Sequence, residues 1–408
     1  MHIDLNSCFA TIEQQANPLL RGKPVVVAAY GTAKGFILSP SIEAKKVGIK
    51  MGMQVGDAQA IYPKVVVLTP DAPKYRDVHL KFKKIFSDYS PKVVPKSIDE
   101  AVIDFTPVQN LYPDLIATAQ EIKVRMKKEI GEWIWCSIGI GPNRFLAKTA
   151  ASFKKPDGLI KITHENVLDI YQKMQLTDLN GINVRYESRL NLNGIFTPLQ
   201  FFDAPADFLR KKVFKSVVGE WWHSRLRGWE VDNVEYARKS FGQQYALGQS
   251  TADPQKLSAI LMKLCEKMGR RLRHAGFCAQ GIHVAVRFKK DYSYWHLGKK
   301  FPHSMSSTQE LYQKAQFILD QQPLRKEVGL ISVTCFELIP RQEAEQFSLF
   351  YDKDRAAKVS DAMDLINNKY GEYVITSARM MGMKNVVLDR IAFGRIRELE
   401  SVDVAYIQ

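Results

Sequence analysis

The first 160 residues alternate short apolar stretches with segments of helical periodicity. Strand-length apolar runs cover residues 25–29 and 65–68, and further strand-like patterns surround residues 93–105 and 134–140. Between the last two, residues 115–130 place apolar positions at helical spacing, with a basic outer face. Such alternation predicts a mixed α+β sheet domain.

A short helix is predicted between the first and second of these strand-like regions. Ser39 would be its N-cap and Pro40 its first helical position, because both residue types favour those places. Gly48 would end the helix.

The pattern changes after residue 160. Residues 161–235 read as short helices broken by glycines, which predicts a small helical module packed by Trp221, Trp222 and Trp229. Residues 240–340 then combine a long helix over 254–275 with strands near 281–288 and 329–338.

Beyond Pro340 the chain is polar for several residues, and a last helix is predicted up to Gly371. Its apolar residues Val359, Met363 and Ile366 would share one face.

Length and cysteine content narrow the class of protein. A chain of 408 residues is too long for one core, so several domains are expected. The apolar runs are far shorter than a membrane span, and no export leader is recognisable. Five scattered cysteines without paired spacing favour reduced thiols, no zinc site and a cytoplasmic location.

The net charge of +15 indicates a polyanionic partner, of which nucleic acid is the commonest. Most of the excess lies in residues 1–160 and 241–340, which carry +7 each. A basic surface kept only for solubility is the alternative. Charge by itself does not name an activity.

Three carboxylates stand in strand-like surroundings, where burial is costly unless they are paired or bind a metal. Asp4 ends an apolar opening, and Asp99 and Glu100 interrupt a second apolar run. Oxygen ligands favour Mg²⁺ or Mn²⁺ over Zn²⁺. Strand alternation would separate Asp99 from Glu100, so a kink or strand end is needed if both serve one site. Taken singly, each acid could equally cap a turn or face solvent.

These acids belong to motifs that resemble the Y-family DNA polymerases, the translesion group. Residues 2–13 (HIDLNSCFATIE) look like the family's first catalytic strand and following helix, and residues 97–101 (SIDEA) resemble its second acidic motif. Residues 139–148 (GIGPNRFLAK), followed by 155–158 (KPDG), are similar to its third block. The three motifs occur in the family's order.

The resemblance implies two Mg²⁺ ions, with Mn²⁺ as a substitute, held by Asp4, Asp99, Glu100 and the backbone carbonyl of Leu5. Phe9 matches the steric gate, the aromatic residue that excludes a ribose 2′-hydroxyl; ordinary core packing is its alternative role. The triphosphate would lie near further residues that the family pattern marks: Cys8, Ser39, Lys45 and Lys155. The family commonly has Tyr and Arg where this chain has Ile42 and Lys45, which puts nucleotide affinity in question.

DNA and clamp contacts are also implied by the resemblance. Hairpins at Gly181 and Gly219 resemble those whose backbone N–H groups meet DNA phosphates. Basic residues in the third segment would track the backbone of primer–template DNA: Arg270, Arg273, Arg287 and Lys289. Residues 346–350 (QFSLF), with Gln346, Leu349 and Phe350 as anchors, resemble the peptide that docks on the sliding clamp.

The resemblance therefore predicts a multidomain right-hand polymerase. Its parts would be a palm (1–16 and 69–160), fingers (17–68), a helical thumb (161–235), a little finger (236–340) and a C-terminal tail (341–408). We expect a monomer that transfers deoxynucleotides to a primer 3′-hydroxyl in error-prone translesion synthesis, without proofreading and without membrane association. The alternative is a catalytically inactive relative that recruits other polymerases through the clamp.

Overall fold

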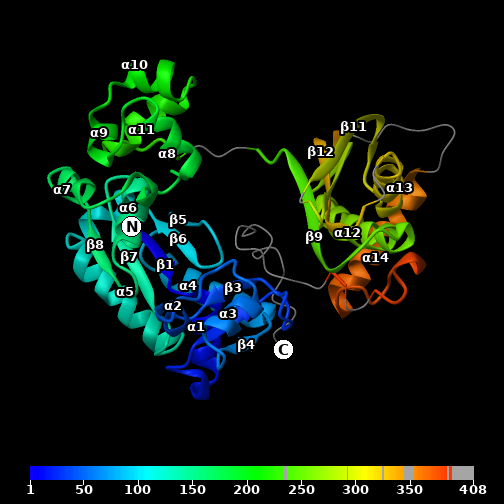
Figure 1. Ribbon diagram of the computed structural model, residues 1–408, viewed down its shortest axis with the longest axis horizontal. Helices are drawn as coiled ribbons and strands as arrows, with labels where there is room; N and C mark the ends of the chain where they lie inside the picture. The colour runs from blue at the N-terminus through cyan, green and yellow to red at the C-terminus, as the bar shows by residue number, and fades with distance from the viewer. Residues whose placement is uncertain (234–236, 292, 324–325, 344–352, 384–385, 388–408) are drawn as a thin grey trace. The chain divides into compact units, whose positions relative to one another are not determined.

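The protein folds into two compact units, which Figure 1 shows as a ribbon. The first unit lies within residues 1–233 and the second within residues 237–387. The computed structural model describes residues 1–233, 237–291, 293–323, 326–343, 353–383 and 386–387. Within these ranges no helix has the length and apolar character needed to cross a membrane.

A five-stranded sheet organises the first unit. Its strand order is β5-β6-β1-β7-β8, and all neighbours are antiparallel except β7 and β8. The strands are β1 (His2–Leu5), β5 (Val93–Pro95), β6 (Glu100–Ile103), β7 (Cys136–Ile140) and β8 (Leu159–Lys161). The helices that pack on it are α1 (Cys8–Ala16), α4 (Ala72–Ser87), α5 (Leu115–Glu129) and α6 (Arg144–Phe153).

The two faces of this sheet have different partners. Ile3 and Leu5 of β1 point into an apolar core shared with α1, α4 and α5. Because side chains alternate along a strand, His2 and Asp4 point to the opposite face. Helix α6 packs on that second face over β7, so closely that a side chain on Gly139 would collide with the α6 backbone. The helix predicted over residues 115–130 and the strands predicted near 93–105 and 134–140 are confirmed.

A smaller three-stranded sheet, of order β3-β2-β4, is inserted between α1 and α4 in the sequence. Its own core is formed mainly by valine, isoleucine and alanine. The elements of this part are η1 (Pro18–Leu20), β2 (Val25–Ala28), β3 (Ile37–Pro40), α2 (Ile42–Lys46), α3 (Val55–Ile61) and β4 (Val66–Leu68). A further short turn, η2 (Thr106–Leu111), follows β6.

The predicted start of the short helix is wrong by two residues. Ser39 lies in β3, paired with Val27, and its buried hydroxyl accepts a hydrogen bond from the Ala10 N–H at 3.4 Å. Ser41 is the N-cap instead, since its hydroxyl accepts from the Ala44 N–H at 3.1 Å. Strand pairing decides between the two serines, which look alike as local caps.

Residues 161–233 form the predicted helical module, whose core also includes Phe145, Leu146 and Ala150 of α6. Asn183 begins one of its helices by accepting hydrogen bonds from two backbone N–H groups. Of the tryptophans expected to pack it, Trp222 is buried, but Trp221 and Trp229 are 39% and 70% exposed. The elements are α7 (Val167–Gln172), η3 (Leu176–Asp178), α8 (Val184–Asn191), α9 (Pro198–Asp203), α10 (Ala206–Phe208), η4 (Leu209–Val213) and α11 (Val218–Leu226).

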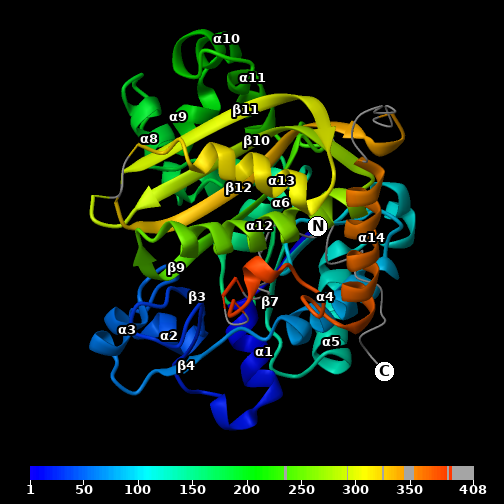
Figure 2. The same cartoon turned by 90° about the vertical axis from the view of Figure 1, so that its right-hand side faces the viewer.

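The second unit is a four-stranded antiparallel sheet of order β11-β10-β12-β9. Two helices, α12 and α13, cover one face of this sheet (Figure 2). Buried apolar side chains of these helices and of the strands form the core of the unit. The elements are β9 (Ser240–Thr251), α12 (Pro254–His274), β10 (Phe277–Phe288), β11 (Tyr294–Met305), α13 (Thr308–Leu319) and β12 (Val328–Pro340). The helix and strands predicted in residues 240–340 are confirmed.

The C-terminal helix packs on this unit by polar contacts. The segment comprises η5 (Arg341–Glu343), α14 (Lys353–Tyr370) and η6 (Ala378–Met380). The Arg273 guanidinium donates to Asp364 of α14 at 2.7 Å, and Arg341 pairs with Asp361 at 2.6 Å. Of the three residues predicted to share one face of this helix, Val359 is 52% exposed, whereas Met363 and Ile366 are partly buried.

A buried carboxyl in this unit makes its stability dependent on pH. Glu266 of α12 is buried, and its Oε2 makes no hydrogen bond within the described residues. Burial, reinforced by the charge of Asp364, raises the pKa of Glu266 to about 7. The unfolded chain therefore releases this proton at lower pH than the folded chain, and stability is lost as pH rises from about 4.5 to about 7.

We expect Glu266→Gln to stabilise the protein at about pH 8 by roughly 2 kcal/mol and to change little near pH 4.5. Urea unfolding of the full chain at both pH values measures the difference. Glu343→Gln, the same chemical change at an exposed position, is the matched control. Equal effects of Glu266→Gln at both pH values would contradict the raised pKa.

Candidate active site

Strand pairing brings the first two predicted carboxylates together. Asp4 of β1 lies directly opposite Glu100 of β6 in the antiparallel register, so both side chains leave the same face of the sheet. His2 shares that face, two residues before Asp4. One ligand atom from each of His2, Asp4 and Glu100 lies within 4.8 Å of the others.

The third predicted carboxylate, Asp99, lies in a bend just before β6. Its backbone carbonyl accepts the Leu5 N–H at 2.9 Å, and its side chain accepts the Ser97 hydroxyl. The strand therefore begins at Glu100, and Asp99 precedes it in the bend. The two acids thus stand at a strand end, which is the condition under which adjacent acids can face the same site. Asp99 is not a member of the group of ligand atoms within 4.8 Å of one another; its charge contributes, after burial and the charge of Glu100, to raising the pKa of Asp4.

Burial acts to raise the pKa of both paired acids, and nearby lysines act against it. Burial raises the pKa of Asp4 to about 6, against the opposing effect of Lys155, whose ammonium lies 2.7 Å from Asp4 Oδ1. Burial also works to raise the pKa of Glu100, but the hydrogen bond and charge of Lys148, 2.8 Å away, outweigh it and lower that pKa. Burial lowers the pKa of His2 to about 3, although the charge of Glu100 acts to raise it, so the imidazole is neutral.

Lys155 is held over Asp4 by a hydrogen-bonded loop. The Asn6 side chain accepts the Asp157 N–H at 2.7 Å and donates to the Ser137 hydroxyl at 3.1 Å. Ser137 in turn accepts the Gly158 N–H at 3.2 Å. Asn6 and Lys148 are functional candidates that the sequence motifs contain but do not mark, and Ser137, a third candidate, lies just before the third motif.

The arrangement fits a divalent cation. The acids provide hard oxygen ligands on one face, and each of Asp4 and Glu100 has an ammonium group within 3 Å. Buried carboxylates that require positive partners are the kind of donor set that a metal ion satisfies. His2 Nε2, buried and without a hydrogen bond in the described chain, lies 3.8 Å from Glu100 and was missed in the sequence.

Two of the residues expected near a nucleotide, Cys8 and Lys45, lie within electrostatic reach of the carboxylates. Phe9 is buried and stacks on Tyr75, with ring centroids 4.2 Å apart and planes 7° apart. Cys8 is buried, and burial, assisted by the charges of Asp99 and Asp4, raises its pKa. Partial burial and then the charge of Lys155 lower the pKa of Lys45, which places Lys45 within electrostatic reach of the same site.

The two glycines predicted to meet DNA serve local structure. Gly181 has φ +98°, a conformation that favours glycine, and Trp222 packs against it. Gly219 lies where a side chain would be 2.4 Å from the Arg210 backbone nitrogen, and its own N–H donates to the Ser216 carbonyl at 3.1 Å. The positive φ of Gly181 and the close packing at Gly219 are therefore sufficient reasons for glycine at these positions.

The basic residues predicted to meet DNA divide into two groups. Arg287 of β10 and Lys289 just beyond it are exposed. Arg273 is only 7% exposed and is paired with Asp364, so in this arrangement an ion pair occupies its guanidinium, and its role as a DNA contact stays a prediction. Arg270 donates to Asn368 at 2.9 Å and is turned toward the C-terminal helix as well. Sequence charge did not reveal that the C-terminal helix α14 provides polar partners for both arginines.

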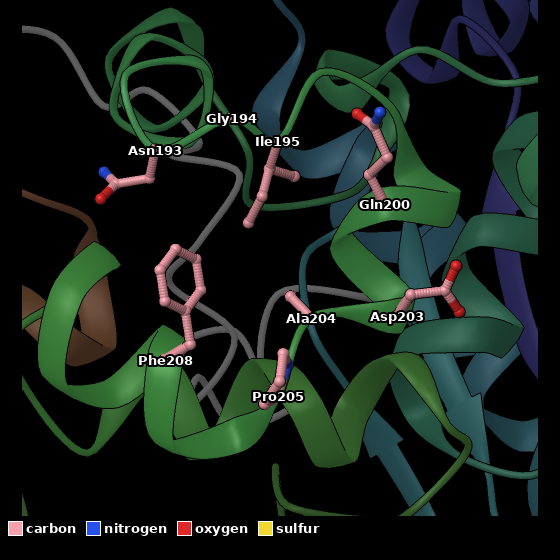
Figure 3. A pocket seen from close by; sticks show the side chains of 8 residues that line it. All are labelled: Asn193, Gly194, Ile195, Gln200, Asp203, Ala204, Pro205 and Phe208. Carbon is pink, nitrogen blue, oxygen red and sulfur yellow. The ribbon is translucent and has the colours of Figure 1, made fainter.

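Two other features lie apart from the carboxylates. The clamp-peptide residues Gln346, Leu349 and Phe350 fall outside the described residues. An open pocket of about 470 Å³ lies in the helical module, and Figure 3 shows the side chains that line it. Its lining includes one acid, Asp203, and none of the predicted site residues.

A sheet face that gathers buried carboxylates beside lysine ammonium groups is typical of enzymes that transfer phosphoryl or nucleotidyl groups with divalent metal ions. Known proteins narrow this class. A family model described as impB/mucB/samB matches residues 3–152, and the model of that family's C-terminal domain matches residues 238–349.

Two curated relatives match nearly the whole chain. A DNA polymerase IV of Moorella thermoacetica is 33% identical over 384 residues, covering 92% of this chain and 94% of the relative. A DNA polymerase IV of Pelotomaculum thermopropionicum is 31% identical over 393 residues, covering 95% and 96%. The chain belongs to the impB/mucB/samB family, the Y-family DNA polymerases of the DNA polymerase IV type.

Solved structures agree with this assignment. The Y-family DNA polymerase chimera Dbh-Dpo4(243-245)-Dbh is 26% identical with a TM-score of 0.73, covering 83% of this chain and 98% of the chimera. A structure described as an insertion ternary complex of Dbh DNA polymerase is 25% identical with a TM-score of 0.56 and the same coverage. The predicted α+β polymerase fold is confirmed, and the family as a whole uses divalent metal ions.

Proposed function

We propose that this chain extends a primer 3′-hydroxyl with deoxynucleotides on damaged templates, using two Mg²⁺ ions. The observation that carries the proposal is the cross-strand pair of Asp4 and Glu100 on one sheet face, with Asp99 beside it. Family membership alone is compatible with a chain that has lost catalysis. A retained cluster of buried acids, costly to stability, favours an active enzyme.

Asp4, Asp99, Glu100 and the Leu5 carbonyl would hold the two ions. When bound, such ions stabilise the attacking and leaving oxygens of an in-line displacement. Lys155 and Lys148 now neutralise the acids, and ion binding would replace them in that role. The freed Lys155 ammonium would then neutralise charge on the departing pyrophosphate, with Lys45 as a second cation near the triphosphate.

The other parts of the chain would serve substrate binding. We assign the five-stranded sheet to the palm, the three-stranded sheet to the fingers, the helical module to the thumb and the second unit to the little finger. Arg287 and Lys289 are exposed and would neutralise phosphates of primer–template DNA without reading sequence. Residues 346–350 would dock on the sliding clamp and raise the effective concentration of the enzyme at the primer end.

Replacing two of the acids tests the metal assignment. We expect Asp99→Ala plus Glu100→Ala to reduce primer extension with Mg²⁺ by about a thousandfold or more, because several kcal/mol of transition-state stabilisation is lost. Asp99→Asn plus Glu100→Gln, which keeps the side-chain shapes, should be equally inactive. Extension that survives in both variants would refute the assignment, and an inactive wild type would favour the recruiting role.

Truncating the gate residue tests sugar selection. With Phe9→Ala, we expect discrimination against ribonucleotides to fall by about a hundredfold, since the space for a 2′-hydroxyl is opened. The measurement compares kcat/KM for a deoxynucleotide and the matching ribonucleotide, and retained deoxynucleotide incorporation shows that the variant is folded. Unchanged sugar choice would leave Phe9 as a core residue only.

The clamp peptide is tested by changing it in place. Triple substitution Gln346→Ala, Leu349→Ala and Phe350→Ala should leave unaided extension unchanged and abolish stimulation by a sliding clamp. Primer extension with and without the clamp measures both quantities. Stimulation equal to that of the wild type would place clamp binding elsewhere in the chain.

A further inference from the structure

A buried acid lies behind the aromatic ring that is assigned to sugar selection. Phe9 and Glu13 are four residues apart on α1 and therefore share one face of that helix. Glu13 is buried, and both of its carboxylate oxygens are used. Tyr75 of α4 donates its hydroxyl hydrogen to Oε1 at 2.8 Å, and the Lys74 ammonium lies 2.7 Å from Oε2.

The same tyrosine packs flat against the gate. The Tyr75 ring is fully buried and lies 4.2 Å from the Phe9 ring, nearly parallel to it. The Tyr75 hydroxyl donates to Glu13, which lies one helical turn from Phe9. This hydrogen bond fixes the hydroxyl end of the Tyr75 ring, and the face of the ring packs on Phe9. Phe9 has no room to move toward α4 while Tyr75 stays in place.

The charges around Glu13 favour its hydrogen bonds with Tyr75 and Lys74. Partial burial disfavours the charge of Lys74, but its hydrogen bond to Glu13 and the charge of Glu13 more than compensate and raise its pKa. Burial and the nearby negative charge of Glu13 raise the pKa of Tyr75, so the phenol stays protonated as a donor. Because both of its oxygens accept from such donors, the buried Glu13 carboxylate is held in one position.

Excluding a ribose by contact requires an immobile ring. A 2′-hydroxyl is a single oxygen atom, and a shift of the gate by about 1 Å would relieve most of the clash. Phe9 carries no polar atom with which to fix itself. Its immobility must come from whatever packs behind it.

We propose that Glu13 and Tyr75 are positioning residues for sugar selection: the Glu13–Tyr75 hydrogen bond holds the tyrosine ring against Phe9 and prevents the gate from retreating. This inference rests on the proposed function, because it takes Phe9 as the residue that excludes the ribose. Neither positioning residue needs to touch the nucleotide.

The test measures kcat/KM for one deoxynucleotide and its ribonucleotide with the full chain, primer–template and Mg²⁺. Tyr75→Phe removes only the anchoring hydroxyl and should lower discrimination roughly tenfold, the usual worth of a hydrogen bond to a charged group. Tyr75→Leu removes the ring and should lower it further. Glu13→Gln keeps an acceptor for Tyr75 and should have the smallest effect. Deoxynucleotide kcat/KM should stay within about twofold in Tyr75→Phe.

Tyr89→Phe is the matched control. The Tyr89 hydroxyl donates to the Glu121 carboxylate at 2.7 Å, a tyrosine–glutamate bond of the same kind just beyond the far end of α4. A merely structural role for such bonds predicts the same small loss of stability in both variants and no change in sugar choice. Only the Tyr75 variant should change the ratio of deoxynucleotide to ribonucleotide incorporation.

A double-mutant cycle shows whether Tyr75 acts through Phe9. With Phe9→Ala already present, Tyr75→Leu should cause no further loss of discrimination, whereas independent action would give additive losses and overturn the inference. If Phe9→Ala alters sugar choice and Tyr75→Phe does not, Phe9 selects the sugar but the Glu13–Tyr75 hydrogen bond does not position it, and the inference is overturned. If Phe9→Ala itself has no effect, the proposed function of Phe9 fails. Should Tyr75→Leu not fold, Tyr75→Phe still decides between these outcomes.

Discussion

The structure depends on holding like charges together on one face of a sheet. Antiparallel pairing of β1 with β6 sets Asp4 opposite Glu100, and the bend before β6 adds Asp99. Such repulsion in a buried place destabilises the fold unless positive groups offset it. Two lysines from α6 and the loop after it provide that offset in the protein alone, and metal ions would provide it during catalysis.

Much of the surrounding architecture follows from this requirement. Gly139 lets α6 lie close to the sheet, which brings Lys148 to Glu100. Asn6 and Ser137 fix the loop that carries Lys155. The face opposite the acids is apolar, and it anchors α1 and α4, the helices that carry Phe9 and Tyr75. The charged face and the apolar face of the sheet thus both follow from the alternation of side chains along β1, where Asp4 points to one face and Ile3 and Leu5 point to the other.

In the second unit, the net charge of the sequence overstates the positive charge that is exposed at the surface, because some arginines are buried or paired. Residues 241–340 are strongly basic, yet Arg273 is buried against Asp364, and Arg270 also has a partner, Asn368, in the C-terminal segment. That segment had no assigned role from its sequence. Its acids now appear as part of the unit's structure, and the exposed cations that remain, such as Arg287 and Lys289, are fewer than the composition suggests.

The sequence by itself determined the family, the order of the elements and the three acids, because these are written in short motifs and in local periodicity. Tertiary structure decided everything that depends on which distant residues meet. Strand pairing made Ser41 and not Ser39 the cap, ion pairing turned Arg273 inward, and helix packing set Tyr75 and Glu13 behind Phe9. His2 entered the site for the same reason, since only the β1–β6 register reveals what a strand residue faces. Local patterns carry propensity, whereas the neighbours of a side chain are fixed by contacts between segments far apart in the chain.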